Sequence, residues 1–155
     1  MLEIKNLPQM IYAATRGTGA YMDTAGPSFG RLMAWAGPKG LVKPAARILG
    51  LSWDDPIRVP AERQRYDAAV TIERPMEVPD GFHVGALPAL SWATLTHKGS
   101  YTKVSETFGA LMEELKKRPD LIVIGLCGMD NYVSGPETPE TDLRTEVSLP
   151  VVWVG

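Results

Sequence analysis

Two acidic residues stand at matching positions in two apolar segments, and both could do chemistry as carboxylates. Glu146 lies near the C-terminus and Asp67 lies 79 positions earlier; each follows an arginine by two positions and precedes an apolar run. A carboxylate held away from bulk water can pair with a cation or take a proton as a general base. The ordinary alternative is a solvated ion pair with the nearby Arg144 or Arg65, which would contribute little to stability.

Strand geometry predicts where these two acids point. Side chains alternate between the two faces of a β-strand. Glu146 should therefore lie on the face opposite Thr145, Val147 and Leu149. By the same alternation, Asp67 should lie opposite its own apolar neighbours. Because the apolar face is expected under helices, both acids are expected on the other side of the sheet, facing a groove.

Large aromatic rings are numerous for a chain of this length. Several of them follow predicted turns rather than lie in a helical stripe, which leaves them free to line a cleft. Aromatic walls around a carboxylate suit a flat or cationic apolar ligand, although any single ring could pack in the core instead. The rings that we expect at a ligand site are Trp53, Trp35, Tyr21, Tyr101 and Tyr132.

The elements that must position these residues occur twice along the chain. Alternating and apolar runs predict strands at 2–6, 10–16, 45–53 and 65–72, and again at 82–86, 90–97, 121–127 and 144–151. Helical periodicity predicts one helix in each copy, over 24–36, with Pro27 near its start, and from Val104 to Leu115. Matching residues keep an offset of 79 or 80 positions, so we expect one domain over 1–155 built from repeats at about 1–74 and 81–155.

This order predicts an α+β fold. Each copy reads strand, strand, helix, strand, strand. Two such modules side by side give a continuous antiparallel sheet with two helices on one face. The pseudo-twofold seam between the modules is a natural place for a ligand groove. A second copy of the chain could close that groove, so a homodimer stays an open alternative.

Composition excludes several other classes. The chain has 155 residues, 45% hydrophobic and 22% charged, and a formal net charge of −2, which argues against direct nucleic-acid binding. The one cysteine, Cys127, and the two histidines, His83 and His97, lack metal-ligand spacing, and Gly17-x-Gly19 is too short for a dinucleotide motif. We therefore expect no metal and no cofactor. No signal peptide or membrane-length apolar window occurs, so the expected location is cytoplasmic, away from the membrane.

Six motifs, in order along nearly the whole chain, resemble those of the GyrI-like small-molecule-binding domain. This domain is also the effector-binding part of AraC-type and MerR-type multidrug regulators. The motifs are Arg16-Gly17-Thr18-Gly19-Ala20-Tyr21, Phe29-x-x-Leu32-x-x-Trp35-Ala36, Leu49-Gly50-Leu51-Ser52-Trp53-Asp54-Asp55-Pro56, Arg65-Tyr66-Asp67, His97-Lys98-Gly99-Ser100-Tyr101 and Arg144-Thr145-Glu146-Val147-Ser148-Leu149-Pro150-Val151.

The resemblance implies two fused βαββ modules of the SHS2 type with a ligand groove at their junction. It also implies that a buried carboxylate and aromatic walls bind lipophilic, often cationic, drugs. One family carboxylate occurs in a Glu-x-Tyr motif, which corresponds here to Asp130-Asn131-Tyr132, with an acid one methylene shorter; the other corresponds to Glu146. The expected ligand-binding residues are Glu146, Asp130, Tyr132, Trp53, Tyr21, Trp35, Tyr101 and Asp67.

Three functions fit these features. The first is a binding module that senses or sequesters a hydrophobic or cationic small molecule. The second is a hydrolase of strained cyclopropane-containing electrophiles, in which Glu146 is the general base on a water and Tyr132 orients the substrate or donates a proton. The third is a gyrase-interacting protein, which the net charge of −2 supports little. Because no helix-turn-helix precedes the first strand, DNA binding by this chain itself is not expected.

Overall fold

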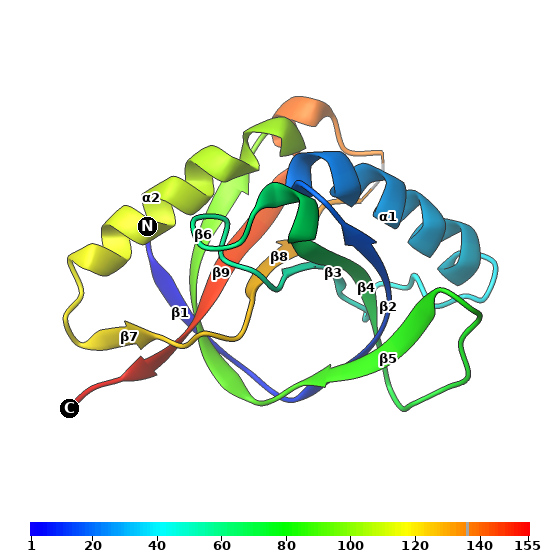
Figure 1. Ribbon diagram of the computed structural model, residues 1–155, viewed down its shortest axis with the longest axis horizontal. Helices are drawn as coiled ribbons and strands as arrows, with labels where there is room; N and C mark the ends of the chain where they lie inside the picture. Colours follow the sequence, from blue (N-terminus) through cyan, green and yellow to red (C-terminus); the bar gives the residue numbers. More distant parts are fainter. Residues whose placement is uncertain (136) are drawn as a thin grey trace. The chain divides into compact units, whose positions relative to one another are not determined.

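The computed structural model describes residues 1–135 and 137–155, which form two compact units. Unit 1 comprises Met1–Pro8 and Ala89–Gly155, and unit 2 comprises Gln9–Pro88. Each unit consists of antiparallel strands and one α-helix (Figure 1), so the chain has the α+β fold that the sequence predicts.

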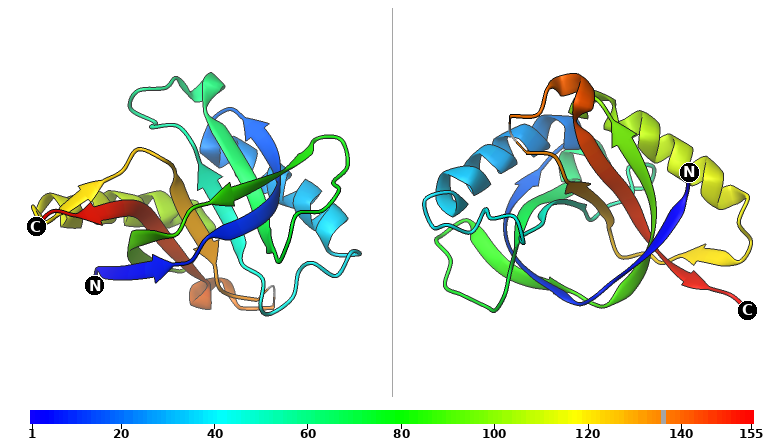
Figure 2. Two further views of the ribbon diagram at one scale, coloured as in Figure 1. Left: turned by 90° about the horizontal axis from the view of Figure 1, so that it is seen from below. Right: turned by 180° about the vertical axis from the view of Figure 1, so that it is seen from behind.

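Unit 1 is a four-stranded antiparallel sheet extended by one short strand. The strand order is β1 (Glu3–Leu7), β6 (Leu90–Lys98), β9 (Arg144–Trp153) and β8 (Gly128–Tyr132), and β7 (Leu121–Val123) pairs with the far end of β9. Figure 2 shows β7 beside that end of β9, close to the C-terminus. The helix α2 (Val104–Lys116) follows a 3-10 turn at Tyr101–Lys103, and a second 3-10 turn, Glu140–Asp142, precedes β9.

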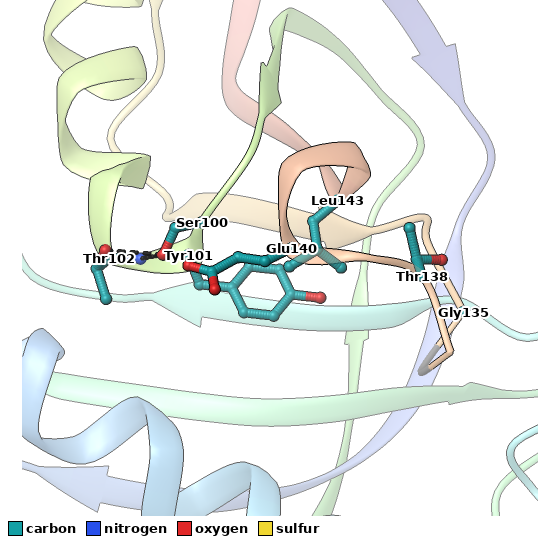
Figure 3. Close-up of a pocket in the computed structure, with 7 residues that line it drawn as sticks. All are labelled: Ser100, Tyr101, Thr102, Gly135, Thr138, Glu140 and Leu143. Carbon is teal, nitrogen blue, oxygen red and sulfur yellow. Dashed lines mark hydrogen bonds between the residues drawn. The ribbon is translucent and has the colours of Figure 1, made fainter.

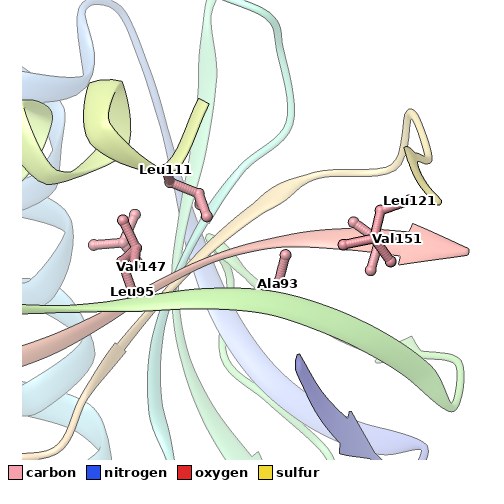
Figure 4. Close-up of a cluster of buried hydrophobic side chains, with 6 residues drawn as sticks. All are labelled: Ala93, Leu95, Leu111, Leu121, Val147 and Val151. Atoms are coloured by element: carbon pink, nitrogen blue, oxygen red, sulfur yellow. The ribbon is translucent and has the colours of Figure 1, made fainter. Parts of the chain in front are cut away.

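The core of unit 1 lies between α2 and the strands β6 and β9. Leu111 of α2 is fully buried and belongs to one cluster with Leu95 of β6 and Val147 and Val151 of β9 (Figure 4). Val147 and Val151 are four residues apart, so they share one face of the strand, as alternation requires. Burying apolar side chains of this size stabilises the unit by about 2 kcal/mol each, which holds the register of β9 and the faces on which its polar residues lie.

Unit 2 repeats this arrangement. Its strand order is β5 (Phe82–Leu87), β2 (Met10–Thr18), β4 (Arg65–Ile72) and β3 (Ile48–Ser52), and its helix is α1 (Tyr21–Ala36), with a 3-10 turn at Ala61–Arg63. Leu32 and Ala36 of α1 pack with Ala68 and Val70 of β4 and with Ala13 of β2. The helix therefore covers the face that carries the even-numbered residues of β4, as alternation along that strand predicts.

Backbone hydrogen bonds show the equivalence of the two modules. Gly19 N donates to Gln64 O and Gly99 N donates to Leu143 O, both at 2.8 Å. Gly19 has a φ of 139° and Gly99 a φ of 111°, a region that L-residues with a Cβ rarely occupy. Each glycine follows the second strand of its module, so the same glycine-dependent turn joins that strand to the helix in both copies.

The compact units divide the chain differently from the predicted repeats. β1 is the outer strand of unit 1 and pairs with β6, whereas β5 is the outer strand of unit 2 and pairs with β2. Residues 1–8 therefore belong with the second half of the sequence, and residues 82–88 belong with the first half. Each unit takes its outer strand from the other sequence repeat.

Three predicted boundaries differ from the structure. The first helix begins at Tyr21 rather than at residue 24, which places Pro27 inside it rather than at its start. The apolar run 121–127 is not one strand: β7 ends at Val123, the chain turns through Gly125, and a separate strand, β8, pairs with β9 next to β7. The strand predicted over 45–53 is shorter and covers Ile48–Ser52.

Candidate functional site

Glu146 lies on β9 and points away from α2. Its neighbour Val147 packs against α2, so alternation places Glu146 on the opposite face, as the sequence predicts. Glu146 Oε1 accepts a hydrogen bond from Asn131 Nδ2 at 2.9 Å, and Glu146 Oε2 pairs with the ammonium of Lys5. Asn131 lies directly opposite Glu146 in the β8–β9 ladder, and Lys5 comes from β1.

The negative charge of the Glu146 carboxylate is therefore already paired with the positive charge of Lys5. Its side chain is 16% exposed and that of Lys5 is 32% exposed, so the pair is partly shielded from water. The ion pair with Arg144 that we considered from sequence is not formed; within the part of the chain that the structure describes, Lys5 takes that place. A cationic ligand at Glu146 would have to displace Lys5.

Asp130 lies on the opposite face from Glu146. It is paired with Val147 in the β8–β9 ladder, and Val147 faces α2, so Asp130 points to the α2 side. The side chain of Asp130 is half-buried and makes no hydrogen bond or ion pair within residues 1–135 and 137–155. Burial raises the pKa of Asp130 to about 7, because the charged form loses hydration. This acid can change its protonation state near neutral pH.

Tyr132 is the tyrosine nearest to Asp130 on β8. It follows Asp130 by two residues and shares its face, so the two positions are about 7 Å apart along the strand. The ring of Tyr132 packs edge-on against the ring of Tyr101, with 5.3 Å between centroids and 89° between planes. The α2 side of β8 thus carries an uncompensated acid and a pair of aromatic rings.

A depression of about 530 Å³ opens beside Tyr101 (Figure 3). Tyr101 is 47% exposed, and partial burial raises the pKa of its phenol. Glu140, an exposed residue, lines the same depression (Figure 3). The lining residues are Ser100, Tyr101, Thr102, Gly135, Thr138, Glu140 and Leu143. They come from the turn before α2 and from the loop before β9.

The acid and the tyrosine that we paired for catalysis do not converge. Tyr132 lies opposite Thr145 in the β8–β9 ladder, and Thr145 faces the α2 side, away from Glu146. Glu146 and Tyr132 therefore point to opposite faces of neighbouring strands. Tyr132 shares its face with Asp130 instead, so a joint role of acid and phenol falls to that pair.

In unit 2, Asp67 is the centre of a hydrogen-bonded cluster. It is fully buried. Arg16 donates from Nε to Asp67 Oδ1 at 2.8 Å and from Nη2 to Oδ2 at 3.0 Å. Oδ2 also accepts from Trp53 Nε1 at 2.8 Å and lies 3.2 Å from His83 Nε2. A carboxylate offers about four acceptor sites, so the cluster already uses its capacity.

The pairing of Arg65 with Asp67 that we considered from sequence is not formed. Arg65 instead donates from Nη2 to Asp54 Oδ1 at 2.9 Å and from Nε to Oδ2 at 3.0 Å. This guanidinium lowers the pKa of Asp54. Asp67 does lie on the face opposite α1, as predicted, because its neighbours Ala68 and Val70 pack against that helix.

Tyr21 and Trp35 lie on the other side of the unit 2 sheet. The Tyr21 ring packs against Tyr66 with 5.9 Å between centroids, and its hydroxyl donates to Asp54 O. Burial is the main reason that the pKa of Tyr21 is raised. The Trp35 ring packs 4.9 Å from that of Phe82, within the apolar cluster under α1. The structure therefore does not bring these two rings together with Asp67 and Trp53.

Several residues of these sites were not predicted from the sequence. Lys5 and Asn131 hold Glu146, His83 binds Asp67, and Glu140 lines the depression beside Tyr101. Only Asn131 had a usable signal, since it is the middle residue of the acid-x-Tyr motif. The others reach their partners through strand pairing or a loop fold, which local sequence does not show.

No group of three or more histidine, cysteine, aspartate or glutamate side chains is placed to hold a metal ion in residues 1–135 and 137–155. In the same residues, neither α1 nor α2 has the length and apolar content that a transmembrane helix requires.

The fold is that of an α+β domain built from two similar modules. A model of the GyrI-like small molecule binding domain matches residues 1–152. The chain belongs to this family. It is 31% identical to the SPbeta prophage-derived putative transcriptional regulator YosT of Bacillus subtilis over 120 residues, which cover 75% of this chain and 78% of YosT. It is 32% identical to a DNA gyrase inhibitor of Enterobacter lignolyticus over 76 residues, which cover 49% of this chain and 47% of that protein.

Solved structures show the same fold. The EcmrR C-terminal domain superposes with a TM-score of 0.79 at 16% identity, over 99% of this chain and 98% of that domain. The chain spans 58% of the EcmrR chain in its complex with DNA. SAV2435, solved bound to tetraphenylphosphonium, superposes with a TM-score of 0.67 at 17% identity, over 98% of this chain and 94% of SAV2435.

Proposed function

We propose that unit 1 binds a lipophilic small molecule with a cationic or aromatic group at the depression beside Tyr101. The observation that carries this proposal is the Tyr101–Tyr132 ring pair: Tyr101 lines the depression, and Tyr132 packs against it. Asp130, a half-buried acid without a protein partner in the described residues, does not line the depression but shares the α2-side face of β8 with Tyr132. The cationic group of such a ligand would pair with the carboxylate of Asp130. Its apolar part would pack against the two tyrosine rings.

The energies favour a weakly hydrated cation. A cation over an aromatic face gains about 0.5–2 kcal/mol, and a desolvated opposite charge adds a similar or larger attraction. A lipophilic cation loses little hydration when it leaves water, so these gains are not offset by desolvation. The depression of about 530 Å³ is large enough for a drug-sized group. Glu140 is the acidic residue among those that line the depression, so it adds a negative charge there.

The comparison proteins support this choice of ligand. SAV2435 was solved with tetraphenylphosphonium, a large cation without hydrogen-bond donors. YosT is named as a putative transcriptional regulator. These names and the site in unit 1 support a role in sensing or sequestering such compounds. The ligand contacts that we predicted for Glu146, Asp67, Trp53, Tyr21 and Trp35, and the groove at the junction of the repeats, stay predictions.

Equilibrium dialysis with tetraphenylphosphonium tests this function. The wild-type chain should bind it saturably and should bind neutral triphenylphosphine oxide less tightly. Asp130→Asn and Tyr101→Ala should each weaken binding about tenfold, as the loss of one charge or one ring contact requires. Glu113→Gln is the matched control, because Glu113 is exposed on α2 and pairs only with Lys116 in the described residues. Equal affinities for all four proteins would refute the proposed site.

Hydrolysis of a strained electrophile is the second candidate, favoured by the pKa of about 7 at Asp130. A general base works best when its pKa lies near the working pH. Asp130 would take a proton from water, the water oxygen would bond to one cyclopropane carbon as the ring C–C bond breaks, and the other carbon of that bond would take a proton from Tyr132. Tyr132 would then regain a proton from solvent and Asp130 would release its own, so the net reaction is addition of one water. Mass spectrometry of a cyclopropane-bearing alkylator should then show addition of one water, and Asp130→Asn should abolish it. Unchanged turnover in that variant would exclude the role.

A further inference from the structure

His97 of β6 connects three elements of unit 1. It lies opposite Thr145 in the β6–β9 ladder, on the face of the sheet that α2 covers. Its ring is buried, and both ring nitrogens have partners. Nδ1 lies 2.7 Å from Thr107 Oγ1 of α2, and Nε2 lies 2.8 Å from Ser100 O in the turn before α2. His97 therefore joins β6 both to the helix and to the turn that precedes it.

The chemistry of the two partners assigns the tautomer of His97. A carbonyl oxygen only accepts hydrogen bonds, so Nε2 must carry a hydrogen and donate it to Ser100 O. A threonine hydroxyl can donate, so Nδ1 can accept from Thr107 Oγ1. Of the two tautomers of the imidazole ring, only the one with its hydrogen on Nε2 satisfies both bonds.

The turn that His97 holds carries Tyr101 to the depression. Ser100 immediately precedes Tyr101, and Ser100 Oγ accepts from Thr102 N at 3.2 Å at the start of the 3-10 turn. These three turn residues line the depression, and His97 lies behind them (Figure 3). The ring of Tyr101 packs edge-on against that of Tyr132. A shift of Ser100 would move Tyr101 relative to Tyr132, because a planar peptide bond joins Ser100 directly to Tyr101.

Unit 2 folds without this connection. Gly17 of β2 takes the position of His97, since Gly19 and Gly99 stand two residues further on and make equivalent hydrogen bonds. A Cβ at Gly17 would lie 2.7 Å from Oγ of the buried Ser28, so this position has no room for an imidazole ring. The helix of this module therefore packs on its sheet without a histidine, which argues for a role of His97 beyond that packing.

We propose that His97 is a positioning residue for the ligand site of unit 1. Its two hydrogen bonds hold Ser100 against α2 and thereby fix Tyr101 at the depression, packed against Tyr132. This inference rests on the proposed function, because it assigns a role at the site proposed there. A lipophilic cation meets a ring that is already in place, so little freedom is lost on binding. Release of the turn should weaken binding of tetraphenylphosphonium about three- to tenfold, as expected when one side chain must be ordered on binding.

Substitutions of His97 and its partner separate the two hydrogen bonds. The amide nitrogen of glutamine reaches about as far as Nε2, so His97→Gln can still donate to Ser100 O and should keep most of the affinity. The shorter asparagine cannot reach Ser100 O, so His97→Asn should show the full loss. Thr107→Val removes the partner on α2 and should give a smaller loss in the same direction. Ser105→Ala, at an exposed residue of α2, is the matched control and should leave the affinity unchanged.

A double substitution distinguishes positioning of Tyr101 from a general effect on stability. If His97 acts through Tyr101, His97→Asn should weaken binding of tetraphenylphosphonium in the wild-type background. In a Tyr101→Ala background, His97→Asn should have no further effect on the affinity measured by equilibrium dialysis. Equal weakening in the two backgrounds, or no weakening in either, would overturn the proposal.

NMR of the ligand-free chain tests the positioning independently of the proposed function. The ¹⁵N spectrum should show the hydrogen of His97 on Nε2, and a nuclear Overhauser effect should connect the rings of Tyr101 and Tyr132. His97→Asn should weaken that effect, and His97→Gln should preserve it. A hydrogen on Nδ1 alone, or an unchanged effect in His97→Asn, overturns the inference. If His97→Asn does not fold, the tautomer and Thr107→Val decide. If the wild-type chain binds no tetraphenylphosphonium, the proposed function fails, and the NMR results still decide whether His97 positions Tyr101.

Discussion

The affinity of unit 1 for a lipophilic cation should depend on pH through one residue, Asp130. Its pKa is raised from the ordinary 3.8 to about 7 by burial. If only the charged form binds the cation, the binding-competent fraction is about one tenth at pH 6 and about nine tenths at pH 8. The affinity for tetraphenylphosphonium should therefore rise about tenfold between these values and level off above them.

Equilibrium dialysis at constant ionic strength over that pH range is the assay. Asp130→Asn should remove the pH dependence and leave the affinity near the low-pH wild-type value, since asparagine mimics the protonated acid. Glu113→Gln should keep the wild-type profile, because Glu113 is exposed and pairs with Lys116. By linkage, bound cation should also lower the pKa of Asp130, which NMR of the carboxyl carbon can follow. A wild-type affinity that does not change with pH would refute the reasoning.

The raised pKa of Asp130 also predicts how the free energy of unfolding changes with pH. The folded state keeps a proton on Asp130 between pH 3.8 and about 7, while the unfolded chain has lost it. The contribution of Asp130 to the free energy of unfolding should therefore fall as pH rises through that window, by a few kcal/mol at most. Urea titrations of the wild type and of Asp130→Asn should diverge with rising pH, with the variant the more stable. Parallel profiles would contradict the sign.

Three further predictions concern the scaffold. Leu111→Ala should lower the free energy of unfolding by about 2–5 kcal/mol because it empties a fully buried position. Met112→Ala, at the exposed neighbouring position, should change it by less than about 0.5 kcal/mol. Equal effects of the two variants in urea unfolding would refute the packing role assigned to Leu111. Asp67→Asn should cost about 3 kcal/mol because four donors lose their charged acceptor, and full wild-type stability would show that the cluster is not structural. The fragment 9–88 should unfold cooperatively because it holds every element of unit 2, and the fragment 9–81, which lacks β5, should not; cooperative unfolding of both would show that β5 is dispensable.

The periodicity of apolar residues predicted helices and strands well where it matched only one kind of element. Arg65–Ile72 was predicted to the residue, and α2 to within one residue, because alternation and a helical stripe are unambiguous there. The start of α1 was missed by three residues because Pro27, taken as a mark of the helix start, is tolerated inside that helix, which begins six residues before it at Tyr21. The run 121–127 was mistaken for one strand because apolar residues continue through a turn at Gly125.

The ion-pair partners of the acids could not be predicted where they come from distant strands. Alternation placed Glu146 on the correct face, but its partner Lys5 is 141 positions away and reaches it only because β1 joins the other half of the chain. The same limit applies to Asp67, for which the sequence offered Arg65 as an alternative partner and which binds Arg16 instead. Which cation meets which acid depends on strand order, which no local pattern shows.

The exchange of outer strands has a consequence for synthesis on the ribosome. All four strands of unit 2 have been made once residue 88 emerges, so this unit can fold while the rest of the chain is still being translated. β1 is made first, yet its partner β6 begins only at Leu90. At a translation rate of about 5–20 residues per second, β1 stays unpaired for several seconds before β6 is made. Glu3 and Lys5 put two charges on the unpaired strand, and charges of this kind disfavour pairing with a wrong strand during that time.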